Sequence, residues 1–215
     1  MPAENYYYLA ALPPLEDLQQ APPISPPEML EQLEDSDGYD LVEAVLLSDD
    51  LLQRESALAG ELTVPAPAVL SPVQVRGEEP LPPKLQTAET VTAGPRAPSD
   101  VIWATYYQYA MEVAERRHSQ FLADWVGYEV ALRNALVAAR AKALELEPTD
   151  YLVAPELGSG VEDYTQTVNE WASAENPLAG QRALDRARWR WLTTHDRHFT
   201  FSNDELAAYA AKLLL

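Results

Sequence analysis

The longest regular pattern of apolar and polar positions follows Ser99 and runs without proline until Pro148. Alanine, leucine, glutamate and arginine, all strong helix formers, are frequent in it, and apolar side chains recur at intervals of three and four residues. The stretch therefore predicts one very long helix, or two in tandem, with an apolar stripe that needs a partner helix. The stripe consists of Trp103, Tyr106, Tyr107, Ala110, Val113, Ala114, Phe121, Leu122, Trp125, Tyr128, Leu132 and Leu136.

Two more helices are predicted after this stretch. Asn176 followed by Pro177 is typical of a helix start, because asparagine caps free N–H groups and proline fits the first turn. Ser202 and Glu205 have the spacing of a capping box, with Phe201 placed to pack as a hydrophobic staple. The two apolar faces are expected to include Leu184, Trp191, Leu192, Leu206, Tyr209 and Leu213.

Two shorter helices are predicted in the first 60 residues. Pro26 and Pro27 favour a helix start. Asp40 and Glu43 have a spacing like that of a capping box, which places the start of a second helix near Asp40. Ahead of both, the aromatic run at 6–9 is expected to form a short strand or an extended arm that packs its rings on a helix.

Residues 62–98 break the helical pattern with repeated prolines, at positions 65, 67, 72, 80, 82, 83, 95 and 98. Proline ends helices and cannot donate to a strand ladder, so this segment is predicted to be a linker or an irregular arm. Apolar side chains are expected to fix part of it to the core: Val69, Leu70, Val73 and Val75.

These patterns predict a mainly α fold, a helical bundle with long helices, a short N-terminal strand or extended arm, and a proline-rich irregular segment. We divide the chain into residues 1–61, the arm at 62–98, and a helical domain at 99–215. The first and third parts are expected to form one compact domain.

The charge of the chain excludes one class of partner. The 34 acidic and 15 basic side chains give a formal net charge of -19, and residues 1–100 alone hold 18 of the acids and 4 of the bases. Such a surface repels a polyanion, so nucleic acid is not expected as a partner.

Composition also indicates a compartment. The chain has no cysteine, which rules out disulfides and thiolate metal sites and fits a reducing environment. No run approaches the roughly 20 apolar residues that span a bilayer. We expect a cytoplasmic protein with no direct membrane insertion.

Motifs for catalysis, cofactor binding or metal binding are weak. His195 and His198 stand three apart, but with His118 elsewhere they lack a third converging ligand, and exposed positions at helix ends are the simpler interpretation. Gly158 and Gly160 lack the rest of a phosphate loop. No serine stands in a nucleophile-elbow pattern. We therefore predict no catalytic, cofactor-binding or metal-binding residue.

One segment, 182–197, combines arginines with tryptophans and is the best candidate for a docking face. The same pattern would suit nucleic acid, which the net charge disfavours. It would equally suit arginines that pair with surplus acids while Trp191 packs inward. The predicted protein-docking residues are Arg182, Arg186, Arg190 and Trp189.

Two polar positions in the middle of the chain carry structural predictions. Glu129 and Arg133 are four residues apart, an order that favours an ion pair along one helix. Asn134 is expected either to bond to a neighbouring helix or define packing register, or to be exposed.

Three segments carry a resemblance to a known family: Tyr6–Leu15, Phe121–Leu136 and Leu206–Leu213. They resemble an uncharacterised bacterial family encoded in V-type ATPase operons, at about the place where other operons encode the C-type stalk component, the equivalent of the eukaryotic d-type one. The helix-rich pattern is also distantly similar to that C/d-type component, although the latter is considerably longer and built from repeated helical units.

The resemblance implies a non-catalytic subunit or accessory protein that couples or assembles the central stalk and the membrane ring in proton or sodium transport. Its partners would be V-type ATPase stalk and ring subunits, and its place the cytoplasm or, through the complex, the inner face of the plasma membrane. A free-standing helical adaptor or regulatory protein is the alternative, and an enzyme of unrecognised type is the third hypothesis.

Overall fold

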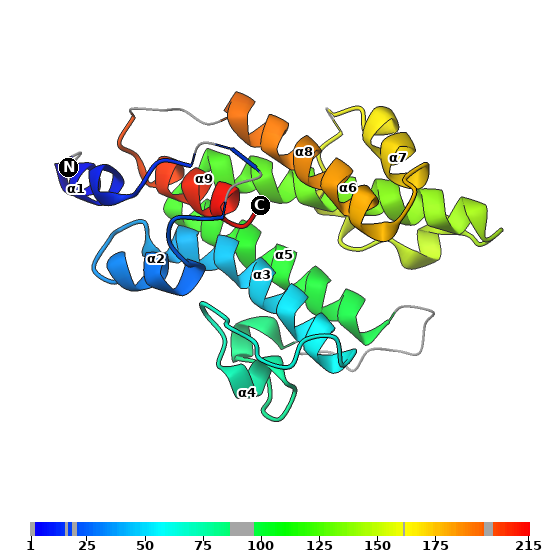
Figure 1. Cartoon of the computed structure of the whole chain (residues 1–215), viewed down its shortest axis with the longest axis horizontal. Coiled ribbons are helices and arrows are strands. Elements are labelled where there is room, and N and C mark those ends of the chain that lie inside the picture. Colours follow the sequence, from blue (N-terminus) through cyan, green and yellow to red (C-terminus); the bar gives the residue numbers. More distant parts are fainter. Residues whose placement is uncertain (1–2, 16, 19–20, 87–96, 161, 196–199) are drawn as a thin grey trace.

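A computed structural model describes residues 3–15, 17–18, 21–86, 97–160, 162–195 and 200–215 (Figure 1). Within these ranges the regular elements are all helical, which confirms the mainly α prediction. The α-helices are α1 (Ala3–Ala11), α2 (Pro26–Gln32), α3 (Tyr39–Leu58), α4 (Pro72–Val75), α5 (Pro98–Arg117), α6 (Gln120–Ala143), α7 (Thr165–Ala172), α8 (Pro177–His195) and α9 (Asn203–Leu213). The short 3₁₀ helices are η1 (Pro83–Leu85), η2 (Pro148–Tyr151) and η3 (Pro155–Leu157).

The long regular stretch forms two helices, α5 and α6, which pack against each other. The chain reverses at His118, which has a left-handed backbone (φ 55°), and Ser119 caps α6 by accepting a hydrogen bond from the Leu122 N–H at 3.1 Å. Asp204 of α9 fixes this turn, because its carboxylate accepts from the Ser119 hydroxyl and from the Phe121 N–H. The predicted stripe faces the core from both helices.

Helix α3 occupies the centre of the core and packs against α5 and α9. Residues 41–47 of α3 are buried with the single exception of Glu43, and Leu51 follows one turn later. On α9, the alanines at 207, 208, 210 and 211 are buried, and their small side chains let the helix approach its neighbours closely. One hydrophobic core thus joins the first 61 residues to the helical domain.

The predicted N-terminal strand or extended arm is wrong, since α1 is a helix. Tyr6 and Tyr7 are 51% and 74% exposed, while Tyr8 and Leu9 pack against the core. Successive side chains on a helix point about 100° apart, so three neighbouring rings cannot share one buried face. Tyr6 instead contacts the ring of Phe201, with ring centroids 5.2 Å apart.

Two predicted capping boxes differ from the structure. Helix α3 begins after Gly38 without a side-chain cap, so Asp40 lies in the first turn, and Glu43 accepts hydrogen bonds from Lys84 (2.6 Å) and Tyr109 (2.9 Å). At α9, the Ser202 side chain makes no capping bond. Its expected partner in the box, Glu205, accepts from the Phe201 N–H at 2.8 Å.

The remaining starts were predicted correctly. Ser25 and Glu28 form a full capping box ahead of the proline pair of α2. At α8, the Asn176 side chain accepts from the Ala179 N–H at 2.9 Å.

The proline-rich arm between residues 62 and 86 is irregular, as predicted, apart from the short helices α4 and η1, and it is fixed to α3 by a buried carboxylate. Asp50 is fully buried and accepts hydrogen bonds from the N–H groups of Ala68, Val69 and Leu70 at 2.8, 2.7 and 2.6 Å. Burial raises the pKa of Asp50, and the three donors act against that rise. Val75 is also buried, as expected, while the part of the arm at 87–96 lies outside the described residues.

Candidate functional site

Helix α8 presents two different faces. Its inner face buries Leu184, Trp191 and Leu192, as predicted. The Trp191 ring lies 5.0 Å from that of Tyr128 and 5.4 Å from that of Trp125, measured between centroids. This aromatic packing fixes the orientation of α8 and turns its opposite face to solvent.

The four predicted docking residues lie together on the outer face of α8. At about 100° per residue, Arg182, Arg186, Trp189 and Arg190 fall within roughly 100° of the helix circumference. The three arginines are exposed and Trp189 is half-buried, with the Lys212 ammonium 6.0 Å from its ring centroid. We call these four residues the α8 arginine face.

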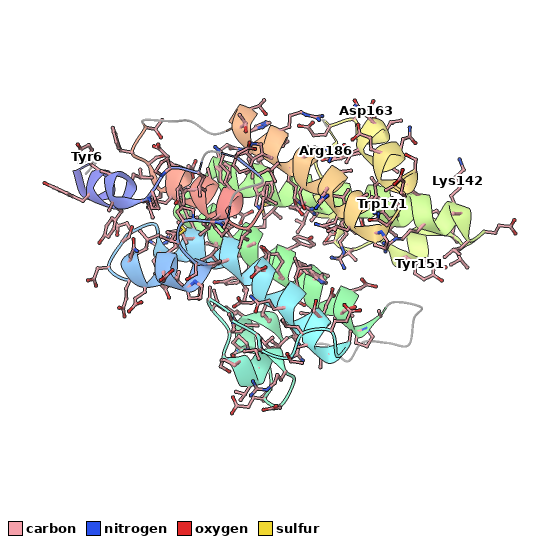
Figure 2. All side chains as sticks on the ribbon, in the orientation of Figure 1. Tyr6, Lys142, Tyr151, Asp163, Trp171 and Arg186 are labelled. Atoms are coloured by element: carbon pink, nitrogen blue, oxygen red, sulfur yellow. The ribbon has the colours of Figure 1, made fainter. Side chains whose placement is uncertain are left out.

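The α8 arginine face is weakly paired. Arg186 reaches Glu170 of α7 at 3.7 Å, with the two side chains 56% and 40% exposed (Figure 2). Among the described residues, Arg182 and Arg190 form no ion pair. Exposed pairs of this kind contribute little to stability, so these guanidinium groups remain open to another molecule.

Arg188, on the inner side of the same helix, is in a different environment. Its guanidinium makes two hydrogen bonds to Glu129 of α6, at 2.7 and 3.0 Å, and lies 3.6 Å from Asp185. Burial disfavours its charge, yet Glu129 and Asp185 hold the pKa of Arg188 above its ordinary value. The pair bridges α6 and α8.

The predicted ion pair between Glu129 and Arg133 is therefore wrong. Arg133 lies 3.4 Å from Asp100 of α5, with its guanidinium 4.8 Å from the centroid of the Trp103 ring. Each residue is thus used between helices instead of along one.

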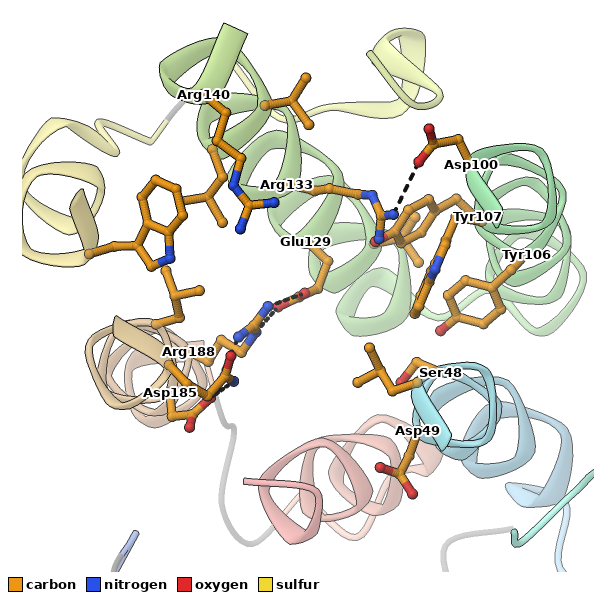
Figure 3. A pocket seen from close by; sticks show the side chains of 18 of the residues that line it. Ser48, Asp49, Asp100, Tyr106, Tyr107, Glu129, Arg133, Arg140, Asp185 and Arg188 are labelled. Carbon is orange, nitrogen blue, oxygen red and sulfur yellow. Dashed lines mark hydrogen bonds and ion pairs between the residues drawn. The ribbon is translucent and has the colours of Figure 1, made fainter. Parts of the chain in front are cut away.

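A cavity of about 660 Å³ lies between these helices, with walls from α3, α5, α6, α7, α8 and α9 (Figure 3). Its lining includes several aromatic side chains, at 103, 106, 107, 125, 151 and 171. It also includes seven charged side chains: Asp49, Asp100, Glu129, Arg133, Arg140, Asp185 and Arg188. Exposed leucines at 52, 144 and 146 also line it.

One face of α6 forms the main polar wall of the cavity. Glu129, Arg133, Val137, Arg140 and Leu144 follow one another at intervals of three or four residues, so they lie along one side of the helix. Figure 3 shows Arg140 directed into the cavity from the same helix as Arg133 and Glu129. The spacing of the charged residues along α6 was a sequence signal for this wall. The spacing did not indicate which residues of other helices form the opposite wall of the cavity.

Arg140 differs from the other two arginines of the cavity. Its guanidinium lies 4.9 Å from the centroid of the Trp171 ring. In the part of the chain that the structure describes, no acid pairs with it, whereas Arg133 and Arg188 both have acidic partners. Arg140 was not among the predicted site residues, because nothing in the sequence pattern separates it from a solvated lysine or arginine.

Residues 88–215 match the family described as Protein of unknown function (DUF2764), and the match covers more than half of the chain. The chain belongs to this family. No curated protein and no solved structure matches the chain.

The DUF2764 region supplies α5 to α9 and thus the whole α8 arginine face. The wall from α3, with Ser48, Asp49 and Leu52, comes from outside the match. Two of the three segments that carry the sequence resemblance, Phe121–Leu136 and Leu206–Leu213, fall inside it, and Tyr6–Leu15 does not.

The other polar candidates lie apart from these sites. His118 and His195 are exposed at helix ends, as expected, and His195 stacks on Trp191 with centroids 4.0 Å apart. His198 lies outside the described residues. No cluster suited to a metal ion occurs within the described ranges. Asn134 exchanges two hydrogen bonds of 2.9 Å with the backbone of Val153, which lies between η2 and η3, so its partner is a loop and not the neighbouring helix that was one of the expectations.

None of the described helices combines the length and the apolar character that crossing a bilayer requires.

Proposed function

We propose that this DUF2764 protein is a non-catalytic subunit or accessory protein of a bacterial V-type ATPase that docks onto its partner through the α8 arginine face. The observation that carries the proposal is the exposure of Arg182, Arg186 and Arg190 side by side on a molecule with a net charge of -19. In so acidic a chain, weakly paired arginines gathered on one face are an unusual local feature.

The chemistry of this face favours an acidic protein surface as the partner. Guanidinium groups form two parallel hydrogen bonds with carboxylates, and the half-buried Trp189 adds an aromatic anchor of the type that dominates protein interfaces. The acidic remainder of the molecule repels such a partner, so only this face would orient toward it. The face therefore fixes the direction of docking.

The resemblance of Phe121–Leu136 and Leu206–Leu213 to the family of V-type ATPase operons supports the choice of partner. It points to the central stalk and the membrane ring, with a role in coupling or assembling them for proton or sodium transport. The proposed location is the cytoplasm, or the inner face of the plasma membrane through the complex. A free-standing helical adaptor or regulator is the alternative.

The test is an affinity pull-down of the tagged protein from detergent-solubilised membranes of its own host, followed by mass spectrometry. We expect V-type ATPase catalytic, stalk and ring subunits in constant ratio. The variant R186E/R190E should lose most of this recovery, because reversed charges repel an acidic surface.

A matched control is R76E/R116E, which changes the net charge by the same amount. Arg76 directly follows α4, Arg116 lies on α5, and both are exposed. It should recover the same subunits as the unmodified protein. Absence of every ATPase subunit from the wild-type pull-down would contradict the proposal and favour the free-standing adaptor. Equal recovery with R186E/R190E would show that docking does not use α8.

A further inference from the structure

The cavity has the dimensions of a ligand site. Its volume of about 660 Å³ lies within the roughly 300–1,000 Å³ of pockets that hold drug-sized molecules. Such pockets are lined mainly by apolar and aromatic groups with a few polar groups that fix orientation. Six α-helices contribute to this lining, which places the walls on rigid elements.

The acids that line the cavity all have protein partners. Glu129 and Asp100 pair with Arg188 and Arg133. Asp185 accepts from the Gln181 amide at 2.7 Å, and Asp49 from the Gln53 amide at 2.7 Å. None of the four carboxylates is therefore left without a donor, although they outnumber the two arginines that pair with them.

Arg140 is left as the cavity cation without an acidic partner among the described residues. Proximity to the C-terminal end of α6 is favourable for a cation there. Arg140 is an exposed residue that lines the cavity, and its guanidinium lies over the Trp171 ring, an arrangement that leaves its N–H edges free to donate. Such a group is placed to bind an anion.

The surroundings of Arg140 define the rest of the ligand. The half-buried rings of Trp171 and Tyr151 offer apolar surface inside the cavity. The exposed leucines at 144 and 146 add apolar surface at the end of α6. A flat apolar body would pack on these surfaces while its charged end met Arg140.

We infer that the cavity binds a small organic anion, an aromatic ring system that carries one sulfonate, carboxylate or phosphate group, with the anionic group on Arg140 and the rings between the aromatic walls. This site is independent of the α8 arginine face, which lies on the opposite side of α8.

The test uses two fluorescent probes that share one ring system. 8-Anilino-1-naphthalenesulfonate carries the anionic group, and N-phenyl-1-naphthylamine lacks it. Titration of the full-length folded protein should give the tighter Kd for the sulfonate. In R140A, the Kd for the sulfonate should rise about tenfold, as for loss of a charged hydrogen bond, while the Kd for the neutral probe stays within about twofold.

Two further variants locate the site. R186A removes an exposed arginine from the outer face of α8 and should leave both Kd values unchanged. V137W fills the cavity from α6 and should weaken both probes, with circular dichroism confirming that the protein is folded. The inference is overturned if wild-type protein does not bind the sulfonate, if R140A weakens both probes equally or neither, or if a folded V137W still binds the sulfonate normally.

Discussion

Arg186 and Arg188 are two residues apart on one helix and lie in opposite environments. The Arg186 side chain is 56% exposed, with one carboxylate 3.7 Å away, while Arg188 is 20% exposed and makes two short hydrogen bonds to Glu129. The inner arginine holds α6 and α8 together, and the outer one is open to another molecule. In this acidic chain, the role of an arginine is therefore set by the side of the helix on which it falls.

The largest expected effect is unfolding of the protein at alkaline pH, caused by the tyrosines buried in its core. Burial raises the pKa of Tyr106, Tyr107 and Tyr128 above the ordinary 10.0, and that of Tyr209 to about 12. A raised pKa in the folded state means that stability is full below about pH 10 and falls as the pH rises toward the folded values. The part of the tyrosinate absorbance that comes from the buried rings should therefore appear together with the loss of far-ultraviolet circular dichroism, above about pH 10. Complete ionisation at the ordinary pKa with the helices intact would contradict this.

R188A should have the next largest effect. Removing the guanidinium leaves the Glu129 carboxylate poorly solvated without its partner, so the free energy of unfolding should fall by about 3 kcal/mol. Urea unfolding measures this. The double variant E129Q/R188M, which removes both charges, should regain at least half of the loss. A single variant as stable as wild type would show that α6 and α8 do not depend on this pair.

D50A tests a buried charge whose partners are backbone groups instead of an arginine. Loss of the carboxylate frees three N–H groups of the proline-rich arm, and the free energy of unfolding should fall by about 2 kcal/mol. Limited proteolysis should then cut between residues 62 and 86 faster than in wild type. Unchanged cleavage would show that apolar contacts such as Val75 hold the arm without Asp50.

R186A should have the smallest effect on stability. Exposed ion pairs contribute little, so the change in the free energy of unfolding should be less than about 0.5 kcal/mol. The same urea experiment, run beside R188A, measures the contrast directly. A loss as large as that of R188A would mean that the outer face is structural and would weaken its assignment to docking.

Much of the helical framework could be predicted from local patterns. The stripe from Trp103 to Leu136 and the start of α8 at Asn176 followed from spacing and capping chemistry, which act over a few residues. The turn at His118 could not be predicted, since no glycine or proline marks it. It is held by Asp204, from a distant part of the chain.

Of the two candidate sites, the α8 arginine face could be predicted from the sequence and the cavity could not. Helical periodicity was enough to place Arg182, Arg186 and Arg190 on one face, and their exposure followed once Trp191 packed inward. The cavity was not predicted, because its walls come from six α-helices that are spread along the sequence. Glu129, the expected partner of Arg133 on α6, pairs instead with Arg188 of α8.

Residue types and the fixed helical period were enough to determine the helical class, the apolar stripes, the acidic surface and the alignment of arginines along α8. The tertiary structure was needed to decide which arginines are paired, which tyrosines are buried, and that Arg140 faces a cavity without an acidic partner among the described residues. Pairing and burial depend on side chains from distant segments, and their positions are set by the packing of the whole core.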